Sequence, residues 1–99
     1  MAQLIIANER FELNELETMV STMEFVKLDK LEVNGIEITL GMWKELLDVL
    51  VKQNTTDKDP AGGVEFIGEE ATYNYAIDED FNVTIQTIDG INLWKTYKH

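Results

Sequence analysis

The sequence predicts a single α+β domain over residues 1–99, with an antiparallel sheet and two helices packed on one face of it. Two turn signals and one helical pattern carry this prediction. Asn34-Gly35 and Asp89-Gly90 each lie between apolar residues, which is a strong short-range signal for a β-hairpin. Apolar residues recur at helical spacing over 40–53.

The N-terminal part predicts two short strands, 4–6 and 11–13, followed by a helix over 14–23. Asn14 with Glu17 has the spacing of a capping box, in which the two side chains satisfy free N–H groups of the first helical turn. The apolar stripe of this helix consists of Leu16, Met19, Val20 and Met23.

A hairpin is predicted over 28–40, with Asn34-Gly35 as a two-residue loop. The loop sets the cross-strand pairs Val33 with Ile36, Leu31 with Ile38, and Asp29 with Leu40. The opposite face carries Lys30, Glu32, Glu37 and Thr39. Register and hydrophobic pattern therefore agree on which face is buried.

The second helix is predicted over 40–53, and Thr39 can cap its start. Its apolar stripe consists of Trp43, Leu46, Leu47, Leu50 and Val51. The segment 54–63 is rich in Asn, Thr, Asp, Pro and Gly, and is expected to be a loop.

A three-stranded antiparallel meander is predicted over 71–97. A three-residue loop, 78–80, would pair Ile77 with Phe81, and the Asp89-Gly90 loop would pair Ile85 with Trp94. Both registers place the same residues on one buried face: Tyr73, Tyr75, Ile77, Phe81, Val83, Ile85 and Trp94. The expected order of elements is β-β-α-β-β-α-β-β-β-β.

The other face of the meander is nearly uncharged: it would carry Thr72, Asn74, Asn82, Thr84, Gln86, Ile88, Leu93 and Lys95. Two explanations are open. The N-terminal segment 4–6 covers this face, over Ile88, Ile91 and Leu93, or the face is a contact surface with acidic flanks.

Charge is the strongest compositional signal, with 19 acidic and 8 basic residues and a formal net charge of -11. No basic residue occurs between Lys58 and Lys95. Such a chain repels nucleic acid and anionic membranes, and favours a partner protein with a basic surface. The alternative is that the acidity serves solubility alone.

Six acids of the meander are the expected partner contacts, because they lie at strand ends and would form two groups about 20 Å apart. One group lies at the 78–80 loop and the other at the opposite end of the strands. The six are Glu69, Glu70, Asp78, Glu79, Asp80 and Asp89.

The residue inventory argues against catalysis and a cofactor. His99 is the only histidine and is terminal, Ser21 is the only serine, and cysteine is absent. Oxygen-bearing residues over 78–89 have the spacing of a calcium loop, but Val83 occupies the position that requires glycine. No metal is therefore expected, although a looser divalent-cation site at 78–80 stays open. The short N-terminal apolar run favours a cytoplasmic protein.

The resulting hypothesis is a non-enzymatic inhibitor that occupies the basic nucleic-acid-binding groove of a partner, such as a nuclease. Carboxylates fixed on turns would take the place of phosphates there. In size and charge alone the chain resembles small phage-encoded inhibitors of nucleases, restriction enzymes and CRISPR effectors. The alternatives are a virion structural or assembly protein that associates through sheet contacts, and an immunity-type protein that neutralises a basic toxin.

Overall fold

The structure, a computed structural model, describes residues 3–55 and 62–93. The elements in chain order are β1 (Gln3–Ile6), β2 (Glu9–Glu12), α1 (Leu13–Phe25), β3 (Lys30–Val33), β4 (Ile36–Thr39), α2 (Leu40–Thr55), β5 (Gly62–Ile67), β6 (Thr72–Ile77), β7 (Val83–Ile88) and β8 (Ile91–Asn92). The α+β class and the order of elements are as predicted. Much of the predicted 54–63 loop lies outside the described residues, but its last two residues begin β5.

The main sheet is mixed rather than wholly antiparallel. Its strand order is β2-β1-β7-β6-β5, with β8 also paired to β7. Strand β1 runs parallel to β7, with Leu4 opposite Val83 and Ile6 opposite Ile85. The N-terminal segment therefore extends the sheet in its own plane, and the first of the two explanations, in which this segment covers the outer face of the meander, is wrong. Hairpin β3–β4 forms a separate two-stranded sheet.

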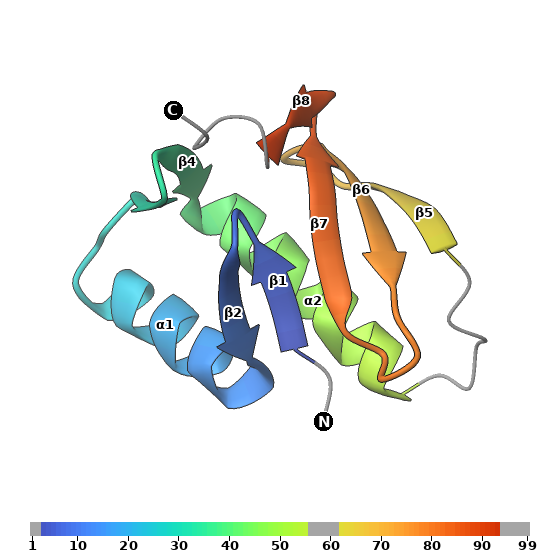
Figure 1. Ribbon diagram of the computed structural model, residues 1–99. Helices are drawn as coiled ribbons and strands as arrows, with labels where there is room; N and C mark the ends of the chain where they lie inside the picture. The colour runs from blue at the N-terminus through green and yellow to red at the C-terminus, as the bar shows by residue number, and fades with distance from the viewer. Residues whose placement is uncertain (1–2, 56–61, 94–99) are drawn as a thin grey trace.

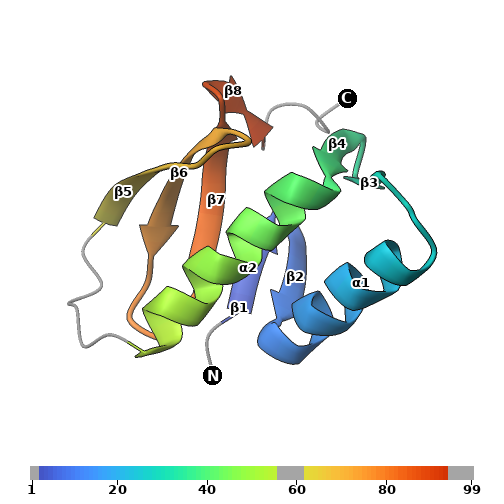
Figure 2. The same cartoon turned by 180° about the vertical axis from the view of Figure 1, so that it is seen from behind.

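Both helices lie on one side of the main sheet, as predicted. Helix α2 runs diagonally across one face, and α1 packs beside α2 next to the β2 edge (Figures 1 and 2). The core fills the space between helices and sheet, and its largest fully buried side chains include Trp43, Tyr73, Leu4, Ile6 and Leu16. Neither helix, within its described residues, has the length and apolar content needed to cross a membrane.

The helix starts show one correct and one wrong capping prediction. Thr39 Oγ1 accepts the Met42 N–H at 3.2 Å, so it caps α2 as expected. The capping box of α1 is formed by Glu12 and Glu15 instead of Asn14 and Glu17. Because Leu13 already has helical geometry, the N-cap is Glu12, two residues before Asn14.

The predicted register of β6 and β7 is shifted by two residues. Ile77 pairs with Val83, so the connecting loop is 78–82 rather than 78–80. Phe81 belongs to this loop with φ +65°, and it is only half-buried. The meander over 71–97 is thus not confirmed in its predicted form, and Trp94 lies outside the described residues.

A β-bulge explains the second error on this sheet. Tyr75 pairs with Ile85 but Asn74 pairs with Thr87, so Gln86 is an extra residue in β7. The extra residue reverses the alternation, and Ile88 faces the core with 5% exposure instead of facing outward. Leu93, also expected on the outer face, is buried as well.

The β3–β4 hairpin has the predicted register. Val33 pairs with Ile36 and Leu31 with Ile38, while Leu40 N donates to Asp29 O at 2.8 Å. Asn34 and Gly35 both have positive φ, +49° and +85°, which a two-residue turn of this twist requires. The Asn34 side-chain amide also donates to Ala7 O, tying the hairpin to the β1–β2 turn.

Replacing Gly35 by alanine should destabilise the fold through backbone strain alone. A Cβ at Gly35 would meet no atom within 4 Å, yet φ would remain near +85°. We expect Gly35→Ala to lower the free energy of unfolding by about 1 kcal/mol, measured by urea unfolding. Gly90→Ala is the matched variant, with φ +81° and equal space, and should cost a similar amount. A neutral Gly35→Ala would contradict this account of the turn.

Candidate partner-binding surface

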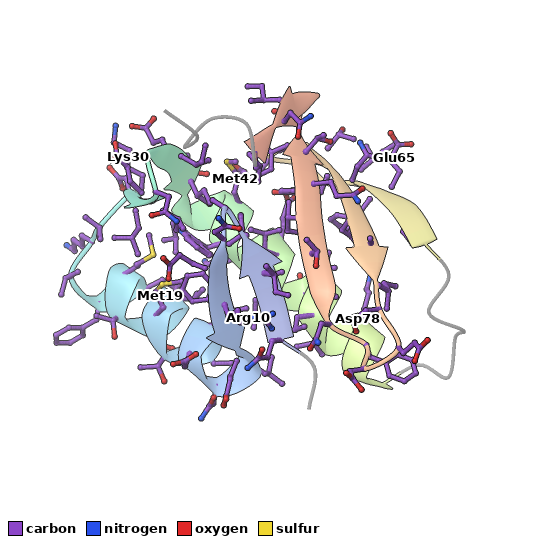
Figure 3. The ribbon with its side chains drawn as sticks, in the orientation of Figure 1. Arg10, Met19, Lys30, Met42, Glu65 and Asp78 are labelled. Atoms are coloured by element: carbon purple, nitrogen blue, oxygen red, sulfur yellow. The ribbon has the colours of Figure 1, made fainter. Side chains whose placement is uncertain are left out.

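The face of the main sheet opposite the helices is open. No helix or strand within residues 3–55 and 62–93 lies over it, and Figure 1 looks onto it. This open face is defined by neutral, partly exposed side chains of the three central strands: Gln3, Ile5, Thr84, Thr87, Asn74 and Ala76. Charged side chains lie at its two edges, with Arg10 on β2 and Glu65 on β5 (Figure 3).

One end of the open face carries the β6–β7 loop with three of the predicted acids. Asp78 Oδ1 accepts the N–H groups of Asp80 and Asn82, each at 2.9 Å, and Oδ2 accepts the Asn82 amide at 3.0 Å. These bonds, chiefly that from the Asn82 backbone, hold the pKa of Asp78 below its ordinary value. The Asp78 carboxylate therefore organises the loop that presents Glu79 and Asp80.

This loop is also joined to the far edge of the sheet. Gln3 N donates to Asn82 Oδ1 at 2.9 Å, and Arg10 donates to Gln3 Oε1 at 3.1 Å. The charge of Arg10 contributes a smaller lowering of the Asp78 pKa. A chain of polar contacts thus runs from β2 through β1 to the loop, and fixes where its carboxylates lie relative to the sheet.

The opposite end of the sheet gathers the other three acids, as the sequence indicated. Asp89 in the β7–β8 turn accepts the Thr72 N–H at 2.9 Å through Oδ1, and its own N–H donates to Thr72 O at 2.7 Å. Thr72 begins β6 immediately after the turn that contains Glu69 and Glu70. Glu69, Glu70 and Asp89 therefore form one exposed group.

Glu45 on α2 positions that group, and sequence reasoning did not identify it. Its Oε2 accepts the N–H groups of Glu69 and Glu70 at 2.6 and 3.1 Å, and its Oε1 accepts the Tyr73 hydroxyl at 2.6 Å. All three donors lie 24–28 residues away in the chain. No local pattern could signal these contacts, because they depend on how α2 crosses the sheet.

Two glycines leave room for this arrangement. A Cβ at Gly68 would overlap the Glu45 carboxylate, and a Cβ at Gly41 would come within 2.5–2.8 Å of the Glu70 side chain. The β5–β6 turn can therefore approach the start of α2 closely. The Glu70 side chain lies against the start of the helix.

None of the ion pairs found in the part of the chain that the structure describes involves the six predicted acids, and the charge of Arg10 acts on Asp78 without forming one. They join Lys30 to Glu37 and Lys44 to Glu24. No group of three or more acidic or histidine side chains in these residues is arranged to hold a metal ion, including the 78–80 loop considered for a divalent cation. The acids thus present net negative charge to solvent.

Five of the six acids divide into two structural kinds, while the side chain of the sixth, Glu70, packs against Gly41 at the start of α2. The carboxylates of Asp78 and Asp89 each accept a backbone N–H and hold a turn in place. The carboxylates of Glu69, Glu79 and Asp80 accept no hydrogen bond from the described residues and are exposed. These three are therefore the carboxylates best placed to contact a partner without disturbing the fold.

Glu45 and Tyr73 should be energetically coupled. Glu45→Ala leaves three donors without their acceptor, and should lower the free energy of unfolding by about 2 kcal/mol. Tyr73→Phe should cost about 1 kcal/mol, and the double variant less than the sum of the two. The exposed Asp48→Ala is the control and should change stability by under about 0.5 kcal/mol. Additive costs in the cycle would show that the two groups do not interact.

Tyr73 should also make stability fall at alkaline pH. Burial, and then the bond to Glu45, raises the pKa of the Tyr73 phenol, so the folded state keeps its proton where the unfolded state loses it. The contribution of Tyr73 to the free energy of unfolding is fully present below about pH 10, and it declines above that pH by up to about 1.4 kcal/mol per pH unit. Urea unfolding between about pH 9 and 11 should show a shallower decline for Tyr73→Phe than for the unmodified chain. Equal slopes would contradict the raised pKa.

Comparison of the chain with protein-family models, with curated proteins and with solved structures found no match. A function can therefore be argued only from the surface itself. That surface combines a neutral, open sheet face with two groups of exposed carboxylates, one at each end of strands β6 and β7.

Proposed function

We propose that this chain is a non-enzymatic binding protein that inhibits a partner by occupying the partner's basic nucleic-acid-binding groove. The observation that supports this most directly is the placement of Glu69, Glu79 and Asp80, which are exposed and supported by hydrogen-bonded turns. Because hydrogen-bonded turns hold the backbone at these three residues, only their side chains must be ordered on binding, and less entropy is lost than on a flexible loop. A nuclease or a nucleic-acid-binding complex in the cytoplasm, as in anti-restriction or anti-CRISPR inhibition, fits this proposal.

The dimensions of the surface support the same partner class. Strands β6 and β7 each contain six residues, so the two acid groups lie about 20 Å apart. The grooves of duplex DNA are about 12 and 6 Å wide, so three successive rows of phosphates span roughly 18 Å, and a protein groove that contacts them spreads its Lys and Arg residues over a comparable width. The neutral open face between the groups can approach such a groove without like-charge repulsion.

The alternative is an assembly protein that associates through its sheet. Strand β5 is an edge strand, and Ile67 on it is 73% exposed. An edge strand offers unpaired backbone groups to another strand, and its exposed apolar side chain adds burial. Such association would persist at high salt, whereas binding through carboxylates would weaken steeply. An immunity-type protein that blocks a basic toxin would share the salt dependence of the first proposal.

Charge reversal at the 78–82 loop should abolish partner capture. Immobilised protein would be exposed to a host lysate at low salt, and bound protein would be eluted with either salt or a short DNA duplex. We expect Glu79→Lys/Asp80→Lys to lose the captured partner, because these carboxylates would replace phosphates. Asp78 is kept unchanged because its carboxylate holds the loop.

The matched control is Glu17→Lys/Asp48→Lys, which changes the net charge equally through two exposed helical acids. It should retain the partner. Elution of the partner by the duplex at constant ionic strength would support a shared groove. Capture that resists both the duplex and high salt would refute the proposal and favour association through the sheet.

A further inference from the structure

An apolar cleft of about 340 Å³ lies beside the Glu69, Glu70 and Asp89 group. It is bounded by the tip of the β3–β4 hairpin, the first turn of α2 and the β7–β8 turn. Its lining consists of Gly35, Ile36, Glu37, Met42, Ile88, Asp89, Ile91 and Leu93. Figure 3 shows Met42 between the hairpin and strand β7. We call this feature the hairpin cleft.

The lining of the hairpin cleft suits an apolar side chain. Ile88 and Leu93 form its buried floor, while Ile91 at its rim is 62% exposed. Met42 contributes a flexible thioether, which adapts to ligands of different shape. A volume near 340 Å³ is at the lower end of small-molecule pockets, and accommodates one aromatic or large aliphatic side chain.

The acidic residues around the hairpin cleft favour a ligand that carries a positive charge next to its apolar side chain. Asp89 lines the cleft and uses only Oδ1 to hold Thr72, so Oδ2 can accept a further bond. Glu37 at the other wall forms an exposed pair with Lys30 at 2.7 Å, a contact that contributes little and is easily exchanged. The Glu70 side chain lies close to Gly41, the residue next to Met42, so the acidic group lies beside the cleft.

We propose that the hairpin cleft binds an apolar side chain that lies next to Lys or Arg on the partner protein. The inference rests on the proposed function, because it places the cleft within the surface that contacts a basic groove. The apolar side chain would be buried in the cleft while the adjacent cation contacts Asp89. Such a buried anchor beside a charged rim is the usual source of affinity in protein interfaces, and the surrounding charges accelerate association.

The tripeptide Lys-Trp-Lys is the probe, with Lys-Ala-Lys and Glu-Trp-Glu as controls. Binding would be followed by NMR of the isotopically labelled full chain, through the methyl signals of Met42, Ile88 and Leu93. We expect Lys-Trp-Lys to shift these signals saturably, with a dissociation constant on the order of 1 mM. Neither control should do so, since one lacks the apolar group and the other the cations.

Ile91→Glu is the diagnostic variant. Ile91 is exposed, so the change should leave the fold intact while replacing the apolar rim of the cleft. It should weaken Lys-Trp-Lys binding by about five-fold despite adding a negative charge, because apolar burial is lost. Ile67→Glu is the matched control on exposed β5, distant in the sheet order from β8, and should leave binding unchanged.

Three outcomes would overturn the inference. The first is Lys-Trp-Lys shifting only the signals of surface acids. The second is a change of the cleft methyl signals with protein concentration alone, which would identify a second copy as the occupant. The third is a nuclear Overhauser contact between the Trp94 indole and the Met42 methyl group, which would show that the chain fills its own cleft.

The experiment separates this inference from the proposed function. If Lys-Trp-Lys does not bind in the cleft but the chain still captures a partner that the duplex elutes, the proposed groove binding stands and only the apolar anchor is refuted. Conversely, if Lys-Trp-Lys binds saturably but no captured partner is eluted by the duplex, the cleft binds peptides that are both basic and apolar, and the proposed occupation of a nucleic-acid groove is refuted. In lysate capture, Ile91→Glu should lower the salt concentration at which the partner elutes, because an apolar contribution that salt does not screen is lost.

Discussion

The carboxylate of Glu45 is the contact on which the arrangement of the acidic surface depends. It joins three parts of the chain at one point: helix α2, the β5–β6 turn and the buried phenol of Tyr73. Because two of its bonds go to backbone N–H groups, it fixes the turn itself and not merely a side chain. The close approach at Gly41 and Gly68 then leaves Glu70 against the helix. One partly buried acid thus orients exposed ones.

What the sequence predicted correctly was encoded locally. Asn34-Gly35 sets both the turn and the register of its hairpin, and Thr39 caps the helix that follows it. The failures involve contacts between distant residues. The parallel pairing of Leu4 with Val83 joins the two ends of the chain, and neither segment carries a signal for the other. The bulge at Gln86 breaks strict alternation, so Ile88 was assigned to the wrong face.

For the candidate surface, too, the features that are encoded locally could be predicted and those that depend on distant contacts could not. Placing Asp78 to Asp80 at one end and Glu69, Glu70 and Asp89 at the other needed only the turn signals and the approximate strand lengths. The role of each carboxylate could not be predicted. Asp78 and Asp89 differ from Asp80, a residue of the same type, in the backbone N–H groups that reach their carboxylates, and those groups are set by the 78–82 loop and by the Thr72 contact. A count of acids cannot distinguish a structural carboxylate from an available one.

This division has an energetic consequence for recognition. Glu45, Glu70 and Asp89 all act on the phenol of Tyr73 in the same electrostatic sense, so negative charge is concentrated at this end of the sheet. Like charges gathered in this way destabilise the isolated protein. Hydrogen bonds from backbone N–H groups to Glu45 and Asp89 offset this repulsion only in part. A cationic partner would relieve the remaining repulsion on binding. In the proposed complex the hairpin cleft would add an apolar contribution that salt does not screen, so charge would govern the rate of encounter and apolar burial the lifetime of the complex.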